Sequence, residues 1–209
     1  MQSLTPSASL LPSFLLLLLL RSAEVVRLDG SLDAGETNAT AEYIRSSCAS
    51  TLYPDVCYSS LSRYAGEVQN DPNRLARVAI SVSLLRARVM AAYLSIMTGQ
   101  AENGPEQLAA AALEDCVSNF DNAVEQIRGS LKQMRGLNPS SPESFRFQMS
   151  NVQTWMSAAL TDQETCTDGF EEVGDCPLKS DVNQRSTHVK QVTRNALALV
   201  NSFVNQTAP

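Results

Sequence analysis

Apolar residues recur at alternating intervals of three and four along four long segments, and this repeat constrains the fold more than any other feature. The segments run from about 72 to 97, 105 to 135, 144 to 173 and 181 to 204. Such spacing gathers apolar side chains on one face of an α-helix, and a sustained period of about 3.5 residues is typical of helices that cross at about 20°. No segment alternates with a period of two, so we expect essentially no strand. The sequence therefore predicts an all-α protein built on an up-down-up-down four-helix bundle.

Each segment has an expected core face. Asp71 can cap the free N–H groups at the start of the first helix, Pro72 suits its first turn, and Gly99 is expected to end it. Its core residues are expected to be Leu75, Ala79, Val82, Leu85, Val89, Ala92 and Ile96. The second core face reads Leu113, Cys116, Phe120, Ala123, Ile127, Ser130 and Met134. The third reads Val152, Met156, Ala159, Gln163, Cys166, Phe170 and Val173, and the fourth Val189, Val192, Ala196, Leu199 and Phe203.

The N-terminus is predicted to be a signal peptide over residues 1–23. Residues 10–20 form an apolar run of suitable length, and cleavage is expected between residues 23 and 34. The alternative is a signal anchor that stays in place. Because no second apolar stretch of this kind follows, we expect a secreted, extracellular protein that is not held in a membrane after the signal is removed. Asn38 and Asn205 start usable glycosylation sequons near the two ends of the domain.

Secretion makes disulfides the expected state of the cysteines. Cys48 and Cys57 are close in sequence, which suits a staple across a short helical hairpin. Cys116 and Cys166 lie on the core faces of two helices, so a bridge between them is geometrically natural and would be worth about 4 kcal/mol in the chain-entropy model. Cys176 is then left over, either as a free thiol that joins two molecules or as a half-buried, inert one.

A shorter unit precedes the bundle. Residues 41–48 and 54–64 each read as a few helical turns, too short to be stable alone in water. We expect them to form a disulfide-stapled hairpin within residues 38–66, followed by the bundle over residues 71–205. Together these would form one domain over residues 38–205.

Composition excludes several classes of function. The 16 Lys and Arg against 22 Asp and Glu give a net charge of −6, which argues against a nucleic-acid-binding surface. A single histidine, His188, cannot supply a His-rich metal site or the two Glu-x-x-His motifs of a di-metal bundle. No nucleophile elbow or phosphate-binding glycine loop occurs. We therefore expect no enzyme activity, no metal and no cofactor.

Polar stripes follow the expected second and third helices. The third carries Gln153, Ser157, Thr161, Glu164, Thr165 and Asp168, and the second Glu114, Ser118, Asp121, Asn122 and Glu125. Such a stripe is by default a solvated face. The third is rich in Thr, Ser and Gln where a merely soluble helix would favour Glu and Lys, and the two helices are expected neighbours. The stripes therefore form a candidate partner-binding surface. Trp155, the only tryptophan, is interpreted first as packing at the core edge and second as an interface anchor.

Several motifs resemble those of the plant invertase/pectin methylesterase inhibitor family. The resemblance covers roughly residues 38–205. It rests on Cys48-x8-Cys57 with Thr51, Tyr53 and Pro54 between them, on Ala112-Leu113-Glu114-Asp115-Cys116 followed by Asp121-Asn122-Ala123-Val124, on NVQTWMSAALTDQETCTDGF over 151–170, and on Asn195-Ala196-Leu197-Ala198-Leu199. It implies a four-helix bundle with an N-terminal hairpin, bridges Cys48–Cys57 and Cys116–Cys166, and an unpaired Cys176.

The resemblance also implies a function. Members of this family are inhibitors, not enzymes, and bind a secreted carbohydrate-active enzyme 1:1 over its substrate cleft. The Pro-Lys-Phe motif of the invertase inhibitors is missing from residues 136–145, and the run 154–161 resembles the pectin methylesterase branch. We therefore expect a cell-wall (apoplastic) inhibitor of pectin methylesterase that regulates pectin de-esterification, as a monomer or weak dimer. An invertase inhibitor is the first alternative. A secreted helical binding module without an enzyme target, for instance one carrying a small apolar ligand, is the second.

The resemblance assigns one contact residue by motif. Thr165 stands where the pectin methylesterase branch has a threonine just before the fourth cysteine, in a region that contacts the enzyme. Thr161, Asp168 and Gln153 join it as candidates by proximity, with Asp121 and Glu125 from the neighbouring stripe.

Overall fold

The structure, a computed structural model, describes residues 30–101, 109–138 and 141–207, with side chains from residue 38 onward. The chain divides into two compact units, residues 1–35 and 36–209. Of the first unit only residues 30–35 are described, as the start of a helix. The second unit contains all the other described residues. The predicted signal peptide lies outside the described residues.

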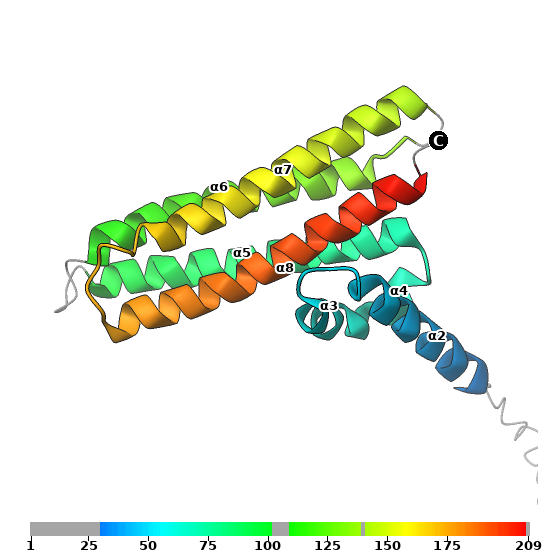
Figure 1. The fold of residues 1–209 in the computed structure, drawn as a ribbon, viewed down its shortest axis with the longest axis horizontal. Helices are drawn as coiled ribbons and strands as arrows, with labels where there is room; N and C mark the ends of the chain where they lie inside the picture. Colours follow the sequence, from blue (N-terminus) through cyan, green and yellow to red (C-terminus); the bar gives the residue numbers. More distant parts are fainter. Residues whose placement is uncertain (1–29, 102–108, 139–140, 208–209) are drawn as a thin grey trace, which may run out of the picture. The chain divides into compact units, whose positions relative to one another are not determined.

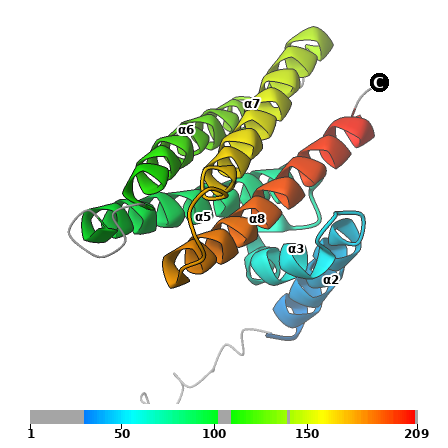
Figure 2. The same ribbon diagram turned by 60° about the vertical axis from the view of Figure 1, so that its left-hand side comes forward.

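Four long helices form the bundle, as predicted. They are α5 (Pro72–Ala101), α6 (Ala110–Arg135), α7 (Pro142–Asp168) and α8 (Pro177–Thr207). Each packs on the next along the chain, and α8 closes the ring by packing on α5 (Figures 1 and 2). The pair α6 and α7 shares the most extensive contact. The described residues contain helices and turns and no strand, so the all-α prediction is confirmed.

Local signals fix three of the helix starts. The Asp71 side chain accepts a hydrogen bond of 2.8 Å from the backbone N–H of Arg74, with Pro72 in the first turn, as predicted. Ser141 and Pro142 do the same for α7. Cys176 stands before Pro177 at the start of α8, where its sulfur accepts from a backbone N–H at 3.4 Å. These starts explain why α7 and α8 begin two and four residues earlier than expected.

The far end of α5 is not where the sequence placed it. The prediction that Gly99 ends this helix is wrong, because the helix continues to Ala101. A glycine in a helical φ/ψ costs only about 1 kcal/mol relative to alanine, which neighbouring turns offset. At the other boundary, α7 ends at Asp168 rather than near residue 173, and Gly169 follows it.

The core faces of α6, α7 and α8 are confirmed almost residue for residue. Every predicted core residue of these helices is buried except Val173, which is half-buried beyond the end of α7. The polar member of the α7 core face, Gln163, is fully buried as well. Between α5 and α8 the hydroxyls of Ser83 and Thr193 meet at 2.8 Å, so this buried polar pair is satisfied.

The predicted core face of α5 is wrong in its second half. Leu85, Val89 and Ile96 are 48%, 57% and 58% exposed, and Ala92 is exposed too. The residues that face the bundle are instead Ala76, Ile80, Ser83, Ala87, Met90 and Leu94. Both sets repeat at helical spacing because α5 is apolar on two sides. This composition also makes α5 the one described helix that is long and apolar enough to cross a membrane, although its inner face is buried against α6 and α8.

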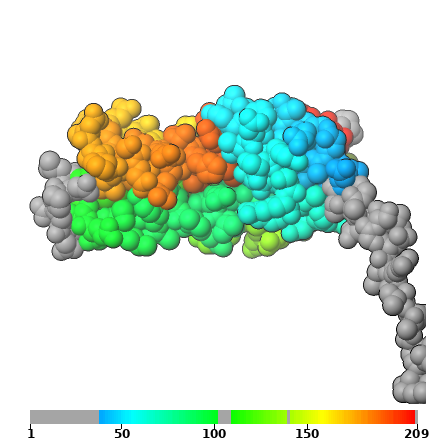
Figure 3. Space-filling model, turned by 90° about the horizontal axis from the view of Figure 1, so that it is seen from below, coloured from blue at the N-terminus to red at the C-terminus, as the bar shows by residue number. Residues whose placement is uncertain are grey.

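A helical hairpin covers the beginning of the outer α5 face. It consists of α2 (Gly30–Cys48), α3 (Pro54–Leu61), a 3₁₀ turn η1 (Ser62–Tyr64) and α4 (Ala65–Val68). Within it, α3 packs on α5 and α8 and α4 packs on α5, and Figure 3 shows this part of the hairpin lying over the two long helices at one end of the bundle. Leu75, Ala79 and Val82 are therefore buried, whereas the later residues of the same stripe have no cover from the described residues. Gln69 and Asn70, with φ of 49° and 56°, turn the chain from α4 into α5.

Both predicted disulfides are present. Cys48–Cys57 staples the hairpin with 5.6 Å between the two Cα atoms, and Cys116–Cys166 joins α6 to α7 with 4.3 Å. Cys176 is free and half-buried. The sequon residues Asn38 and Asn205 are exposed, so both remain candidate glycosylation sites.

The buried amide of Asn195 ties the hairpin to α8. Its Oδ1 accepts from the backbone N–H of Tyr53 at 3.2 Å, and its Nδ2 donates to the backbone carbonyl of Tyr53 at 2.8 Å. Tyr53 immediately precedes α3, so the two bonds hold the loop between the two cysteines of the staple. One side chain thus joins residues that are 142 positions apart.

Candidate functional site

The candidate surface lies along α6 and α7, which run antiparallel in a fixed register. The Cys116–Cys166 disulfide joins them at one level. Further along, Gly129 of α6 faces the ring of Trp155 of α7 so closely that an added Cβ would lie 3.2 Å from Cε3. Counting along the helices from these two points places Thr165 level with Ser118, and Thr161 level with Asn122. The two helices are therefore neighbours, as predicted, with these residues at matching levels.

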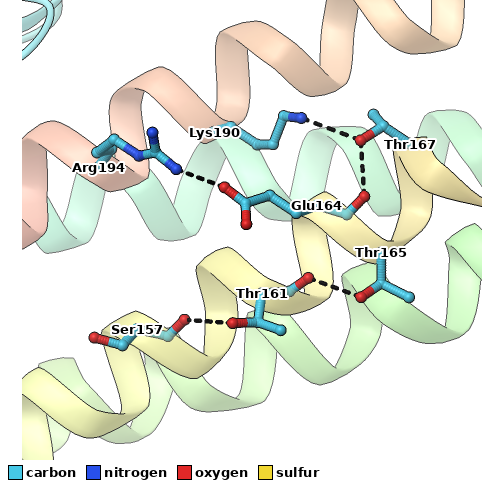
Figure 4. A network of polar contacts seen from close by, with 7 residues as sticks. All are labelled: Ser157, Thr161, Glu164, Thr165, Thr167, Lys190 and Arg194. Atoms are coloured by element: carbon cyan, nitrogen blue, oxygen red, sulfur yellow. Dashed lines mark hydrogen bonds and ion pairs between the residues drawn. The ribbon is translucent and has the colours of Figure 1, made fainter.

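The threonines of α7 are exposed, and their hydroxyls are bonded within the helix. Thr161 donates to the carbonyl of Ser157 at 3.3 Å and Thr165 to the carbonyl of Thr161 at 2.9 Å. Figure 4 shows these three residues in a row along the edge of α7. Because the donors are already satisfied, the residues offer a partner methyl groups and hydroxyl lone pairs, with no donor left unpaired when water is excluded.

The opposite edge of α7 is occupied by contacts with α8. Arg194 pairs with Glu164, and the Lys190 ammonium donates to the hydroxyl of Thr167 at 3.1 Å (Figure 4). Gln153 belongs to this side, because its Nε2 donates to Asn201 of α8 at 2.8 Å. The structure therefore separates Gln153 from Thr161 and Thr165.

The acidic candidates are all exposed. Asp168 is the last residue of α7, and Asp121 and Glu125 lie four residues apart on one face of α6. Glu125 also pairs with Arg128, a contact between two exposed side chains that is worth at most about 1 kcal/mol. These carboxylates give the surface its negative charge.

Sequence reasoning missed a hollow between α6 and α7. A cavity of about 400 Å³ opens between the end of α6 and the middle of α7, lined by Gly129, Lys132, Gln133, Gly136, Gln148 and Trp155. Trp155 is half-buried, so its ring packs on Gly129 with one side and lines the hollow with the other. On the same helix Phe147 is 67% exposed. The available signal was Gly129 itself, because a lone glycine inside a helical pattern often marks a close approach.

A second missed residue lies in the seam between the two helices. Burial raises the pKa of the Asp162 carboxyl above its usual range, and a hydrogen bond with Gln126 of α6 lowers it in part. The carboxyl thus sits partly out of water between α6 and α7. Asp162 is half-buried whereas Thr161 and Thr165 are exposed, so we assign it to the contact between the two helices rather than to partner binding.

Groups that would support catalysis or metal binding are not brought together within the described part of the chain. No three His, Cys, Asp or Glu side chains gather there as a metal site. His188 stands on α8 beside Arg86, and burial and the charge of that arginine lower its pKa. It has no nucleophile as a hydrogen-bond partner among the described residues.

Comparison with known proteins decides the family. The sequence profile described as "Plant invertase/pectin methylesterase inhibitor" matches residues 42–199. The chain belongs to this family. It is 39% identical over 171 residues to "Pectinesterase inhibitor 3" of Arabidopsis thaliana, which covers 81% of this chain and 82% of that protein. It is equally 39% identical over 173 residues to the "21 kDa protein" of Daucus carota, covering 82% of this chain and 89% of the relative.

Solved structures agree on the fold. A mutant form of a pectin methylesterase inhibitor from Arabidopsis superposes with a TM-score of 0.58 at 19% identity, covering 74% of this chain and 92% of that one. At this identity the likeness shows the fold alone. The matched family and the names of its curated relatives identify the chain as an enzyme inhibitor rather than an enzyme.

Proposed function

We propose that the protein is a secreted inhibitor of pectin methylesterase, acting in the cell wall. It binds the esterase 1:1 and covers the pectin-binding cleft with the outer face of α6 and α7. The observation that carries this proposal is the exposed row of Thr161 and Thr165, on a helix that also contributes Trp155 to a hollow and that a disulfide joins to α6. The names of its relatives in this family support the choice of esterase.

The size of this face suits such a complex. α6 has 26 residues and α7 has 27, so each is about 40 Å long. Two helices about 10 Å apart present a face of roughly 800 Å², which is about what one partner buries in a standard interface. A cleft that accepts an extended polysaccharide is open along its length, so a rigid bundle face can close it.

The chemistry of the face favours tight covering without strain. Trp155 is the kind of half-buried aromatic that dominates interface energetics, and the satisfied threonine hydroxyls carry no desolvation cost for unpaired donors. The carboxylates of Asp121, Glu125 and Asp168 are exposed on the same two helices and can interact with charged groups of a partner. Such rim charges act mainly on association rate and specificity.

Two parallel inhibition titrations test the proposal. The purified, oxidised domain is added to a plant pectin methylesterase and to a plant acid invertase, both near apoplastic pH. Loss of esterase activity at an equimolar end point with invertase untouched is expected. Inhibition of invertase alone would instead establish the other branch of the family, and inhibition of neither by the folded domain would favour a binding module without an enzyme target.

A bulky residue in the row tests the surface. Thr165→Trp is expected to weaken esterase inhibition at least tenfold, about 1.4 kcal/mol, because the indole prevents close approach of the cleft. The matched control is Thr187→Trp, at an exposed threonine of α8. Circular dichroism should show equal helicity in both. Equal inhibition by the two variants would remove this edge of α7 from the interface.

A further inference from the structure

A basic groove lies away from the proposed inhibitory face. It has a volume of about 290 Å³ and is formed where α4 and the first turns of α5 meet the end of α6. Its lining includes the guanidinium groups of Arg74, Arg77 and Arg135, with the carboxylate of Glu67 and the hydroxyl of Ser81. Three cations against one anion give the groove a net positive charge in a chain whose net charge is −6.

The remaining charged residues of α5 are also positive. The helix contains Arg74, Arg77, Arg86 and Arg88 and no Asp or Glu over its whole length. The charge of α5 is therefore opposite in sign to the net charge of the chain, −6. A groove of one sign focuses the field and attracts ligands of the opposite sign.

The guanidinium groups of this groove are largely unengaged. Arg74 donates to the side chain of Gln69, which is neutral. Neither Arg77 nor Arg135 forms an ion pair with any described carboxylate, although Glu67 lines the same groove. Arg77 is half-buried and Arg135 is exposed. Guanidinium donors in this state match carboxylates, which accept two parallel hydrogen bonds from one arginine.

We infer that this groove binds the carboxylates of an acidic polysaccharide, a stretch of de-esterified polygalacturonate. The inference rests on the proposed function for its ligand, because hydrolysis of a pectin methyl ester leaves a free carboxylate on the chain. A slender chain of sugar acids fits a concave groove lined by three arginines better than the convex surface of an acidic protein does. The ligand recognised is thus the product of the esterase, and the neutral methyl ester is not bound.

The groove and the inhibitory face are separate. Arg135 and Leu131 of α6 line the groove on the α5 side, whereas Lys132 and Gln133 line the Trp155 hollow on the α7 side. Both ligands therefore have room on one molecule. Binding through the groove would hold the inhibitor on wall regions where esterase has already acted.

Calorimetric titration of the oxidised domain with a short, fully de-esterified oligogalacturonide tests the inference without any esterase present. Binding at low salt is expected, with affinity lost on raising ionic strength and no heat from the fully methyl-esterified oligomer. Arg77→Gln with Arg135→Gln should weaken binding at least tenfold, and the single, exposed Arg135→Gln should weaken it by a smaller factor. The matched control is Arg88→Gln, an exposed arginine of α5 outside the groove.

Three results would overturn the inference. They are absence of binding, equal binding of the methyl-esterified oligomer, and equal loss in the Arg88→Gln control. Poly-glutamate and inorganic phosphate serve as further arms, and binding of either as tightly as the oligogalacturonide would show a general anion or acidic-polypeptide site instead. Esterase inhibition by the double variant is measured separately and should be unchanged. A failed inhibition assay with intact oligosaccharide binding would therefore refute the proposed function alone.

Discussion

Replacing Gln163 by methionine should stabilise the protein. The Gln163 side chain is 0% exposed in the middle of the α7 core face, and neither its Oε1 nor its Nε2 has a hydrogen-bond partner among the described residues. An unsatisfied buried polar group costs about 1–3 kcal/mol. Methionine has the same unbranched shape but carries no amide oxygen or nitrogen, so it fills the space without that cost. We expect Gln163→Met to raise the free energy of unfolding by about 1–3 kcal/mol.

Urea unfolding followed by circular dichroism, with disulfides intact, measures this gain. The midpoint should rise while the slope m stays constant, because the surface exposed on unfolding is unchanged. For a chain of this size each kcal/mol also corresponds to a rise of about 2–4 °C in Tm. Inhibition of the esterase should not change, because the residue is internal.

The buried amide of Asn195 provides a control with the opposite sign. It is 3% exposed, but both ends of its amide are bonded to the backbone of Tyr53. Asn195→Leu leaves the backbone N–H of Tyr53 unpaired and releases the hairpin loop, so we expect the free energy of unfolding to fall by about 1–3 kcal/mol. Two buried amides of the same chain thus respond in opposite directions. A loss of stability in Gln163→Met would refute the reasoning and indicate that a buried water satisfies this amide.

Three further changes test other parts of the structure. Gly129→Leu should lower the free energy of unfolding by about 1–3 kcal/mol through overpacking against the Trp155 ring. It should also shift the fluorescence emission of Trp155, the only tryptophan, to longer wavelength, and an unchanged spectrum would contradict the close packing. Burial and the charge of Arg86 lower the pKa of folded His188 below its unfolded value of about 6.5. The folded state therefore binds the proton less readily than the unfolded state, and acidification through this pH range lowers the free energy of unfolding. Thermal melts between pH 7.5 and 5 should therefore show a smaller acid loss in His188→Gln than in the parent. Cys176→Ser should strengthen the cap of α8, by about 0.5–1 kcal/mol, and remove any disulfide-linked dimer seen on non-reducing gels.

The fold could be predicted where each helix has a single apolar face. In α6, α7 and α8 most of the remaining positions are polar, so the repeat has one interpretation and the core residues follow from it. α5 has two apolar stripes, one toward the bundle and one toward the hairpin and solvent, and periodicity alone cannot choose between them. The choice depends on the hairpin covering Leu75 to Val82, which is a tertiary contact that no local pattern specifies.

The candidate surface was only partly accessible from the sequence. A row such as Thr161 and Thr165 follows from helical spacing, and the structure leaves both exposed. The same spacing could not show that Gln153 turns to Asn201 of α8, because the two edges of a helix are distinguished only by its neighbours. The hollow beside Trp155 depends on how closely two helices approach, which is decided by packing between residues distant in sequence.

The proposed face is rigid for reasons that reach back to a few residues. The bridge from Cys116 to Cys166 locks α6 and α7 one residue from Thr165, and the fit of Trp155 on Gly129 brings the same helices together further along. Two fixed points along the pair leave little freedom in register or spacing. A partner therefore pays little to order this surface, and its affinity depends on contacts rather than on rearrangement. This rigidity is consistent with the proposed role, in which the bundle covers the esterase cleft from outside.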